Sequence, residues 1–248
     1  MIALHLALAA FALPLSAAAK DVKPPVKVVQ RAKYVLPLAV APGFAGKVTV
    51  RGFGLDTATE VTADPGVAVK VVGKARKAAP PQNVPPELTG DTEIDVELTL
   101  PKDFVGPHLS LKLGTADAVK LLVVPRLLAE REPNDGFAKG QLLVLPLTLH
   151  GTIDKPRDVD VYRFVGRKGQ RWTFAVTARK LGSPVDALLT LYDDQRRVVE
   201  SCDDNGTDAD PSFTVTLPRD GVYFLSVIDS HDQGGGIFPY LLSVTRAK

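Results

Sequence analysis

Two short acidic segments near the middle of the chain hold the residue types that could do chemistry. Their oxygen-bearing side chains are those of Glu130, Glu132, Asn134, Asp135, Asp158 and Asp160. Calcium in proteins takes about six to eight oxygen ligands, mostly from carboxylates, amides and backbone carbonyls. Alternate side chains of an extended segment point to the same side, so residues 130–135 can present several of these oxygens together. A fold that brings the two segments side by side would therefore create a calcium site, whereas the simpler alternative is a solvated acidic linker.

A second acidic stretch, residues 203–210, has a calcium-like composition of Asp, Asn and Gly. It lacks the twelve-residue loop ending in Glu that defines an EF-hand. Asp, Asn and Gly are also the ordinary residues of turns. We therefore expect a solvated loop, and a second metal site on which Asp186, Asp193 and Asp194 converge remains an alternative.

Catalytic chemistry finds little support in the sequence. After residue 19 the histidines are His108, His150 and His231, and none lies in a zinc-binding His-Glu-x-x-His or beside a Gly-x-Ser-x-Gly turn. Asp229 and Ser230 directly precede His231, but a catalytic triad needs side chains that converge from separate segments. We predict no catalytic residues, and Trp172 is interpreted as a core residue instead of a platform for sugars. A hydrolase that uses the acidic loops is the alternative.

The first nineteen residues are typical of a secretory signal peptide. Residues 2–15 form an apolar run, and three alanines at 17–19 fit a cleavage site before Lys20. No later stretch has the length of a membrane span. The sequence therefore predicts a secreted, periplasmic or cell-surface protein. The single cysteine, Cys202, cannot pair within the chain, which makes a metal ion a more attractive way of fixing loops. We expect Cys202 itself to be a partly buried residue at a strand end.

The charge distribution argues against a nucleic-acid partner. The formal net charge is only +2, and the sequence shows no clustered basic face of the kind that binds nucleic acid. The densest basic run is residues 74–77. We expect that run to be a solvated loop.

Short segments of alternating apolar and polar residues predict an all-β protein. In the first half they are residues 47–51, 67–72, 93–100, 109–113 and 119–124. In the second half they are residues 142–151, 160–165, 170–178, 187–192, 212–217, 221–228 and 240–245. Residues 78–90 contain four prolines and are expected to form a long loop, because proline cannot join a central ladder. The pattern predicts two β-sandwiches, residues 20–125 and residues 126–248.

The second half resembles a bacterial pre-peptidase C-terminal domain, a jelly-roll-like sandwich appended to secreted peptidases and other exported proteins. The matching elements are Glu130-x-Glu132-Pro133-Asn134-Asp135, Gly151-x-Ile153, Asp158-Val159-Asp160-Val161-Tyr162-Arg163-Phe164, Lys168-Gly169-Gln170, Asp186-Ala187-x-Leu189-x-Leu191-Tyr192-Asp193, Asp203-Asp204-Asn205 and Asp220-Gly221-x-Tyr223-Phe224-x-x-Val227. The collagen-binding domains of clostridial collagenases share this sandwich and bind calcium where the linker meets the first strands. The resemblance places that shell on Asp160 and on four residues of the linker segment, with Asp158 close to the remaining acidic position; the four are Glu130, Glu132, Asn134 and Asp135.

Residues 26–124 more loosely resemble an immunoglobulin-like domain of the transcription-factor (IPT/TIG) type. The cue is Val48-x-Val50-x-Gly52-x-Gly54-Leu55, followed by Ala58-x-Glu60-Val61 and Gly66-Val67. Such a domain directly before a pre-peptidase-type domain is typical of exported planctomycete proteins.

Together these features predict a secreted, non-catalytic protein that calcium stabilises and whose partner is an extracellular protein or polysaccharide. We expect the accessory domain to stand alone, without a peptidase domain. A structural component of the cell envelope is a further alternative.

Overall fold

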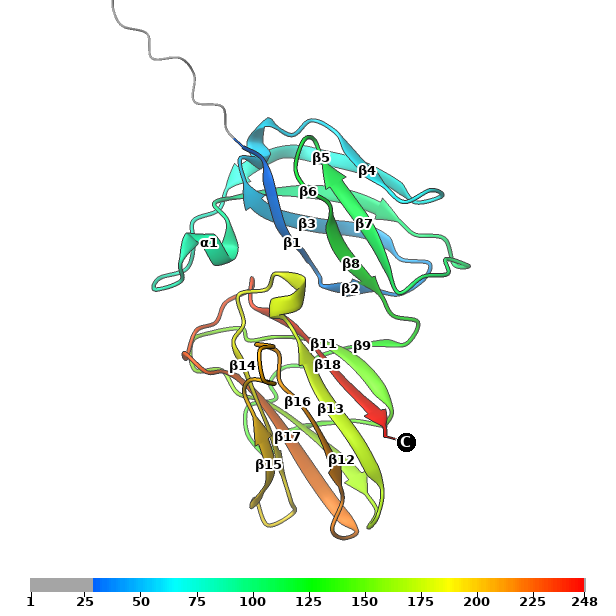
Figure 1. Cartoon of the computed structure of the whole chain (residues 1–248), viewed down its shortest axis with the longest axis vertical. Helices are drawn as coiled ribbons and strands as arrows, with labels where there is room; N and C mark the ends of the chain where they lie inside the picture. Colours follow the sequence, from blue (N-terminus) through cyan, green and yellow to red (C-terminus); the bar gives the residue numbers. More distant parts are fainter. Residues whose placement is uncertain (1–28, 248) are drawn as a thin grey trace, which may run out of the picture.

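The N-terminal half of the chain forms a sandwich of two four-stranded sheets (Figure 1). The computed structural model describes residues 29–247, so the predicted signal peptide lies outside the described residues. One sheet has the order β1-β3-β6-β5, with β1 (Arg31–Leu36), β3 (Ala45–Phe53), β5 (Ala68–Lys77) and β6 (Thr92–Thr99). The other has the order β2-β8-β7-β4, with β2 (Ala39–Val40), β4 (Val61–Ala63), β7 (His108–Leu113) and β8 (Val119–Val123). A 3₁₀ turn, η1 (Leu55–Thr57), follows β3.

The C-terminal half forms a second sandwich of two five-stranded sheets. One has the order β10-β12-β17-β14-β15, with β10 (Gln141–Leu142), β12 (Asp160–Gly166), β14 (Ala187–Tyr192), β15 (Val198–Cys202) and β17 (Gly221–Asp229). The other has the order β16-β13-β18-β11-β9, with β9 (Leu127–Ala129), β11 (Leu147–Thr152), β13 (Arg171–Thr177), β16 (Ser212–Thr216) and β18 (Pro239–Arg246). A 3₁₀ turn, η2 (Arg179–Leu181), follows β13. The all-β prediction of two sandwiches is confirmed.

Alternation along the strands explains both cores. In β6 the side chains of Ile94, Val96 and Leu98 are buried, while the acidic residues between them face outward. In β13 Trp172 and Phe174 are buried in the same way, and Trp172 belongs to the core cluster as predicted. Side chains two residues apart lie on one face of a strand, so each apolar row covers the opposite sheet.

The structure differs from the sequence-based prediction in three local features. The segment predicted as one strand over residues 142–151 divides into β10 and β11, because the Leu145-Pro146 bond interrupts it. The short strands β1, β2, β4, β9 and β15 show too little alternation to be predicted. The basic run 74–77 is not a loop but the end of β5, where Arg76 pairs with Glu93 (2.6 Å) and Asp95 (3.1 Å) on β6.

The proline-rich segment 78–90 joins the two sandwiches. It carries the short helix α1 (Pro86–Thr89) and places Val84 in the hydrophobic core of the C-terminal sandwich, with only 6% of that residue exposed. The amide of Gln233 donates to the backbone oxygen of Asn83 at 3.0 Å. The predicted loop is therefore an arm that reaches from one sandwich to the other.

A second contact joins the sandwiches near the segment that connects β8 to β9. Tyr34, Leu38, Ala39 and Leu241 form a small buried cluster. The Tyr34 hydroxyl donates to the backbone oxygen of Ile237 at 3.2 Å, and the Leu38 N–H donates to His150 Nε2 at 3.3 Å. Burial lowers the pKa of His150, which favours the neutral ring that can accept this bond.

Candidate metal site

Residues 130–135 leave the end of β9 and run along the C-terminal sandwich. β9 pairs in parallel with β11, and the Glu130 N–H continues this ladder by donating to the His150 oxygen at 3.0 Å. The Glu130 side chain is held in turn by the Thr152 N–H, which donates to Oε2 at 2.8 Å. Both contacts come from β11, which thus fixes the backbone and the side chain of Glu130.

The second acidic segment lies directly beside the first. Asp160 begins β12, and Asp135 and Asp160 form an antiparallel bridge. The Val161 N–H donates to the backbone oxygen of Asn134 at 3.3 Å. The fold therefore brings the two segments together, which is the arrangement that a shared ligand shell needs.

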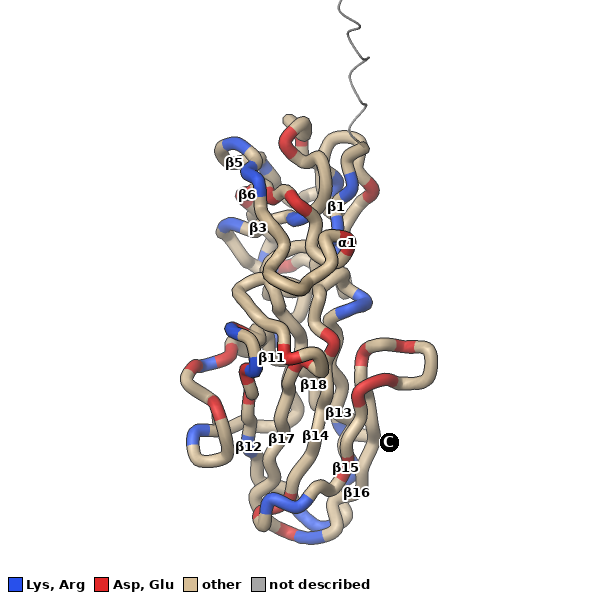
Figure 2. Tube along the Cα trace, turned by 90° about the vertical axis from the view of Figure 1, so that its left-hand side faces the viewer, with Lys and Arg blue, Asp and Glu red and all other residues tan. Residues whose placement is uncertain are grey.

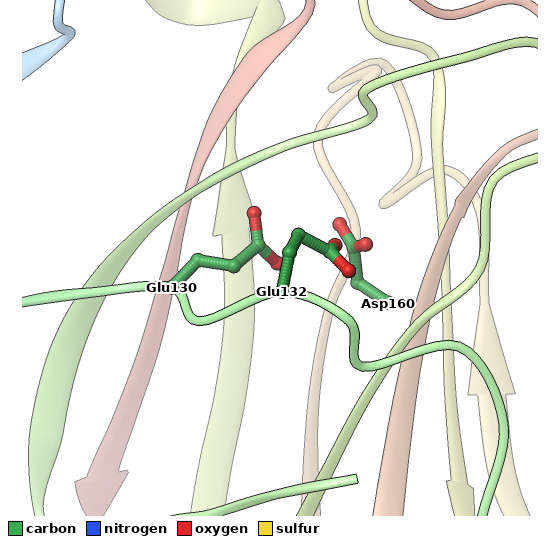
Figure 3. Close-up of side chains that lie close together, drawn as sticks. All are labelled: Glu130, Glu132 and Asp160. Atoms are coloured by element: carbon green, nitrogen blue, oxygen red, sulfur yellow. The ribbon is translucent and has the colours of Figure 1, made fainter. Parts of the chain in front are cut away.

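Two groups of carboxylates result, and they share Glu132. Oxygens of Glu130, Glu132 and Asp160 lie within 4.8 Å of one another, and the three side chains point toward a common space (Figure 3). Oxygens of Glu132, Asp154 and Asp158 form the second group within the same limit. Asp154 was not among the predicted ligands. Its position in the sequence gives no signal, because the turn that precedes β12 brings it to the site, where the Asp154 N–H donates to Asp158 Oδ2 at 2.7 Å.

Asp135 takes a different position from the other predicted ligands. Its carboxylate belongs to neither group and pairs with Lys155 at 3.2 Å. The hydrogen bond from Lys155 lowers the pKa of Asp135. Lys155 also lies 3.0 Å from Asp158 Oδ1, and its own pKa is raised, first by Asp158 and then by Asp135. Lys155 thus neutralises the outer carboxylates of the cluster, those of Asp135 and Asp158. Among the described residues, no basic side chain is paired with the inner carboxylates of Glu130, Glu132 and Asp160.

Two buried oxygens at the centre accept no hydrogen bond from the described part of the chain. They are Asn134 Oδ1 and Asp160 Oδ1, and both residues are fully buried. Asn134 is held in place by its other groups, since its Nδ2 donates to Glu130 Oε1 and its N–H donates to Glu132 Oε2, each at 2.8 Å. Leaving a buried polar oxygen without a partner costs about 1–3 kcal/mol. Such oxygens are therefore expected to have a partner in the working protein.

Two tyrosines form the floor of the site. Tyr162 on β12 donates to Glu130 Oε1 at 2.5 Å, and Tyr240 on β18 donates to Asp160 Oδ2 at 2.6 Å. Their hydroxyls are 2.5 Å apart. Burial, followed by nearby negative charge, raises the pKa of both hydroxyls well above the usual range, so they act as donors that orient the carboxylates.

The acidic side chains raise one another's pKa. Burial first, and then the charge of Glu130, raises the pKa of Asp160 to about 9. Burial and the charges of Glu130, Asp158 and Asp135 also raise the pKa of Glu132. A buried carboxylate with such a raised pKa stays ionised at neutral pH when a cation lies beside it.

The second acidic stretch does not form a comparable group. Asp210 is buried and accepts the backbone N–H groups of residues 178, 179 and 180, while Asp208 pairs with Lys180. Asp193 pairs with Arg197 and Arg219, and hydrogen bonds from Arg197 and Gln195 offset its burial and lower its pKa to about 2. These acids organise turns separately. Cys202 is half-buried at the end of β15.

The neighbours Asp229, Ser230 and His231 do not form a triad. Asp229 is buried and accepts the N–H groups of Asp186, His231 and Gln233. Ser230 Oγ donates to the backbone oxygen of Asp186, and His231 Nδ1 lies 3.0 Å from the Asp186 carboxylate. The serine hydroxyl is therefore directed to a carbonyl and not to the histidine.

Fold and site together define an all-β protein of two sandwiches with a buried acidic cluster beside their junction. Residues 158–228 match the family model of the bacterial pre-peptidase C-terminal domain, and the C-terminal sandwich is a domain of this family.

Over 100 residues the chain is 37% identical to a probable subtilase-type serine protease of Deinococcus radiodurans. This alignment covers 39% of the chain and 14% of that protein, so the chain spans a small part of its relative.

Two solved structures that match this chain are close in length to its C-terminal half. The pre-peptidase C-terminal domain of a Bacillus anthracis collagenase is 19% identical with a TM-score of 0.35, and the match covers 47% of this chain and 100% of that one. A periplasmic inhibitor of g-type lysozyme from Aeromonas hydrophila is 19% identical with a TM-score of 0.34, and the match covers 49% and 96%.

Proposed function

We propose that the C-terminal domain binds a calcium ion between residues 130–135 and the start of β12. The observation that carries this proposal is the pair of buried, unpartnered oxygens, Asn134 Oδ1 and Asp160 Oδ1, beside two further carboxylates. Glu130 and Glu132 supply those carboxylates, and their oxygens lie within 4.8 Å of an Asp160 oxygen. A cation here would satisfy the orphaned oxygens and offset the mutual repulsion of the acids.

The chemistry of the ligands favours calcium over other metals. Both carboxylate groups consist of oxygen ligands and contain neither His nor Cys, whereas zinc prefers nitrogen and sulfur. Magnesium keeps several waters and rarely uses an all-protein cage. The second group, in which Asp154 and Asp158 join Glu132, adjoins the first and supplies additional oxygens. The calorimetric titration therefore also measures how many calcium ions bind per chain.

The role of the ion would be structural, in an exported protein that binds and does not catalyse. Pre-peptidase C-terminal domains are non-catalytic domains typically found with peptidases, and the protease relative supports this association. Among residues 29–247, no helix has the length and apolarity needed to cross a bilayer. The partner would be an extracellular protein or polysaccharide, and calcium would keep the surface that recognises it in one shape.

Thermal unfolding with calcium and with a chelator tests the proposal, together with a calorimetric titration. Saturation at about 100 times the dissociation constant stabilises a protein by about 2.7 kcal/mol. For a chain of this size this corresponds to a midpoint shift of roughly 5–10 °C. Glu132→Ala and Asp160→Ala should abolish the shift, whereas Asp203→Ala in the separate loop should retain it. A wild-type midpoint that calcium leaves unchanged, with no heat of binding, would exclude the site.

The hydrolase alternative makes a different prediction for the same acidic loop. If Asp203 and Asp204 carried out hydrolysis, Asp203→Ala and Asp204→Ala would abolish turnover of peptide or glycoside substrates without changing calcium binding. We expect no turnover by the wild-type protein, and an activity that these two substitutions remove would replace the binding role with an enzymatic one.

A further inference from the structure

A groove runs along the open side of the C-terminal sandwich, away from the calcium site. It has a volume of about 330 Å³ and lies beside the edge strand β10. Residues 142–145 line it together with Phe164, Val165, Gln170 and Trp172. A groove of this size has room for one large apolar side chain or two small ones.

The rim of the groove is unusually apolar for a surface exposed to water. Leu142, Val144 and Val165 are 61%, 81% and 72% exposed. Val222, also exposed, lies directly opposite Val165 in the β12–β17 ladder. Single exposed aliphatic residues are ordinary, but several that adjoin a groove mark an interaction surface.

The segments that line the groove are basic, and Asp220, whose carboxylate accepts the Lys168 N–H at 2.6 Å, is an acidic residue that adjoins them. The two segments that line it, residues 139–146 and 163–172, contain five basic residues and no acidic one. They are Lys139, Arg163, Arg167, Lys168 and Arg171. Arg163 lies beside Leu142 in the β10–β12 pair, and its side chain is exposed. Figure 2 shows several blue segments, with red ones between them, in the loops at the lower end of this sandwich.

We propose that this groove binds an extended segment of another protein that carries apolar side chains alternating with carboxylates. The apolar side chains would enter the groove beside Trp172, and the carboxylates would meet Arg163 and the Arg167–Lys168 turn. The inference names a partner class for the non-catalytic binding role proposed above, and it stands independently of calcium.

Two other occupants fit the observations less well. A second copy of the chain, related by a twofold axis, would place this basic rim against itself, and like charges across an interface are unfavourable. A lipid surface fits less well because Trp172, the largest apolar side chain of the groove, is only 7% exposed and does not protrude to a membrane interface.

Trp172 provides a built-in reporter, since it is the single tryptophan of the chain and lines the groove. The experiment uses a fluorescein-labelled peptide of about twelve residues in which leucine or valine alternates with aspartate. Its binding to the whole protein is followed by anisotropy, and an unlabelled copy is used to follow the Trp172 emission. The control probe has lysine in place of every aspartate. We expect the aspartate peptide to bind and to shift the Trp172 emission, with an affinity that falls as salt is added, and the lysine peptide not to bind.

Paired variants assign the binding to the groove. Val144→Glu should abolish it, and the double variant Arg163→Glu with Arg167→Glu should weaken it by roughly tenfold or more. The matched controls lie on exposed positions of the other sandwich: Val105→Glu, and Lys70→Glu with Lys74→Glu. These should bind like the wild type.

Five outcomes would overturn the proposal. They are no binding of the aspartate peptide, equal binding of both peptides, binding that survives the groove variants, adsorption of anionic vesicles in place of the peptide, and a dimer that Val144→Glu dissociates. Normal calcium stabilisation with no peptide binding would refute the groove alone. Peptide binding without calcium stabilisation would refute the calcium site alone.

Discussion

At the scale of single residues, Asp160 shows why the acidic cluster implies a cation. Its side chain is fully buried, one oxygen accepts the Tyr240 hydroxyl, and the other has no donor among the described residues. In the absence of a cation, burial and the charge of Glu130 make the protonated form the stable one, with a pKa of about 9. A divalent ion reverses this preference, because it interacts only with the ionised form.

This leads to a pH dependence with a definite sign. Between the unfolded pKa of about 3.9 and the folded value of about 9, the calcium-free folded protein holds a proton on Asp160 that the unfolded chain has lost. The folded state then binds more protons, so its free energy of unfolding decreases as pH rises through this window. Calcium binding releases that proton, so the increase in midpoint that calcium causes should be larger at pH 8 than at pH 5. Calorimetric scans with calcium and with a chelator at both values measure this, and an increase that shrinks as pH rises would contradict it.

Asp160→Asn separates the charge from the shape of the side chain. The amide oxygen can still accept the Tyr240 hydroxyl, whereas the ionisable group is gone. In chelator at pH 8 the variant should be at least as stable as the wild type, because it no longer needs a proton to be buried. It should also lose most of the calcium-induced increase. Chemical unfolding in chelator provides the measurement, and a variant destabilised by several kcal/mol without calcium would show that the carboxylate serves the fold and not the ion.

At the scale of elements, short turns are held by buried aspartates that no motif identifies. Asp210 lies in the β15–β16 loop and accepts N–H groups at the start of η2, which follows β13. Asp208 in the same loop makes a partly exposed pair with Lys180 and accepts the Asp210 N–H at 3.2 Å. The composition of the loop predicted a turn, but it did not indicate that Asp210 is buried while Asp208 is partly exposed.

Substitution of these two aspartates should have unequal effects. Asp210→Ala leaves N–H groups at the start of η2 without their acceptor and should lower the free energy of unfolding by about 1–3 kcal/mol. Asp208→Ala, the control, loses a partly exposed ion pair and one hydrogen bond from the Asp210 N–H, and should cost no more than about 1 kcal/mol. Urea unfolding of both variants decides the matter, and equal losses would mean that the loop is held by its charges and not by the buried acceptor.

How far the sequence predicts the structure also depends on the element. Long alternating strands such as β6 were predictable, because a period of two places one whole face in a core. The oxygen-bearing side chains of residues 130–135 and Asp160 predicted that the two segments lie together, as the bridge between Asp135 and Asp160 shows, whereas their role as calcium ligands stays a prediction. Asp154 was not predictable, since its part depends on a turn that folds it back onto Asp158. The groove was not predictable either, because it arises where the strand expected over residues 142–151 breaks at Pro146.

At the scale of the whole molecule, the two sandwiches are joined by more than the chain that connects them. The arm of residues 78–90 inserts Val84 into the C-terminal core, and the cluster around Leu38 covers the start of β18. The C-terminal core thus includes a residue of the other sandwich. Interfaces between domains transmit unfolding when they are apolar and well packed, and otherwise allow each domain to unfold by itself.

We therefore expect residues 29–247 to unfold as one cooperative unit, and Val84→Asp to divide this unit in two. The substitution places a charge in an apolar core, which disfavours docking of the arm while leaving both sheets of the N-terminal sandwich intact. Differential scanning calorimetry should show one transition for the wild type and two for the variant, and a protease should cleave the variant within residues 78–90. Val105→Asp, at a position that is 95% exposed, should leave a single transition. A Val84→Asp protein that still unfolds in one step at a lower temperature would show that the cluster around Leu38 couples the sandwiches without the arm.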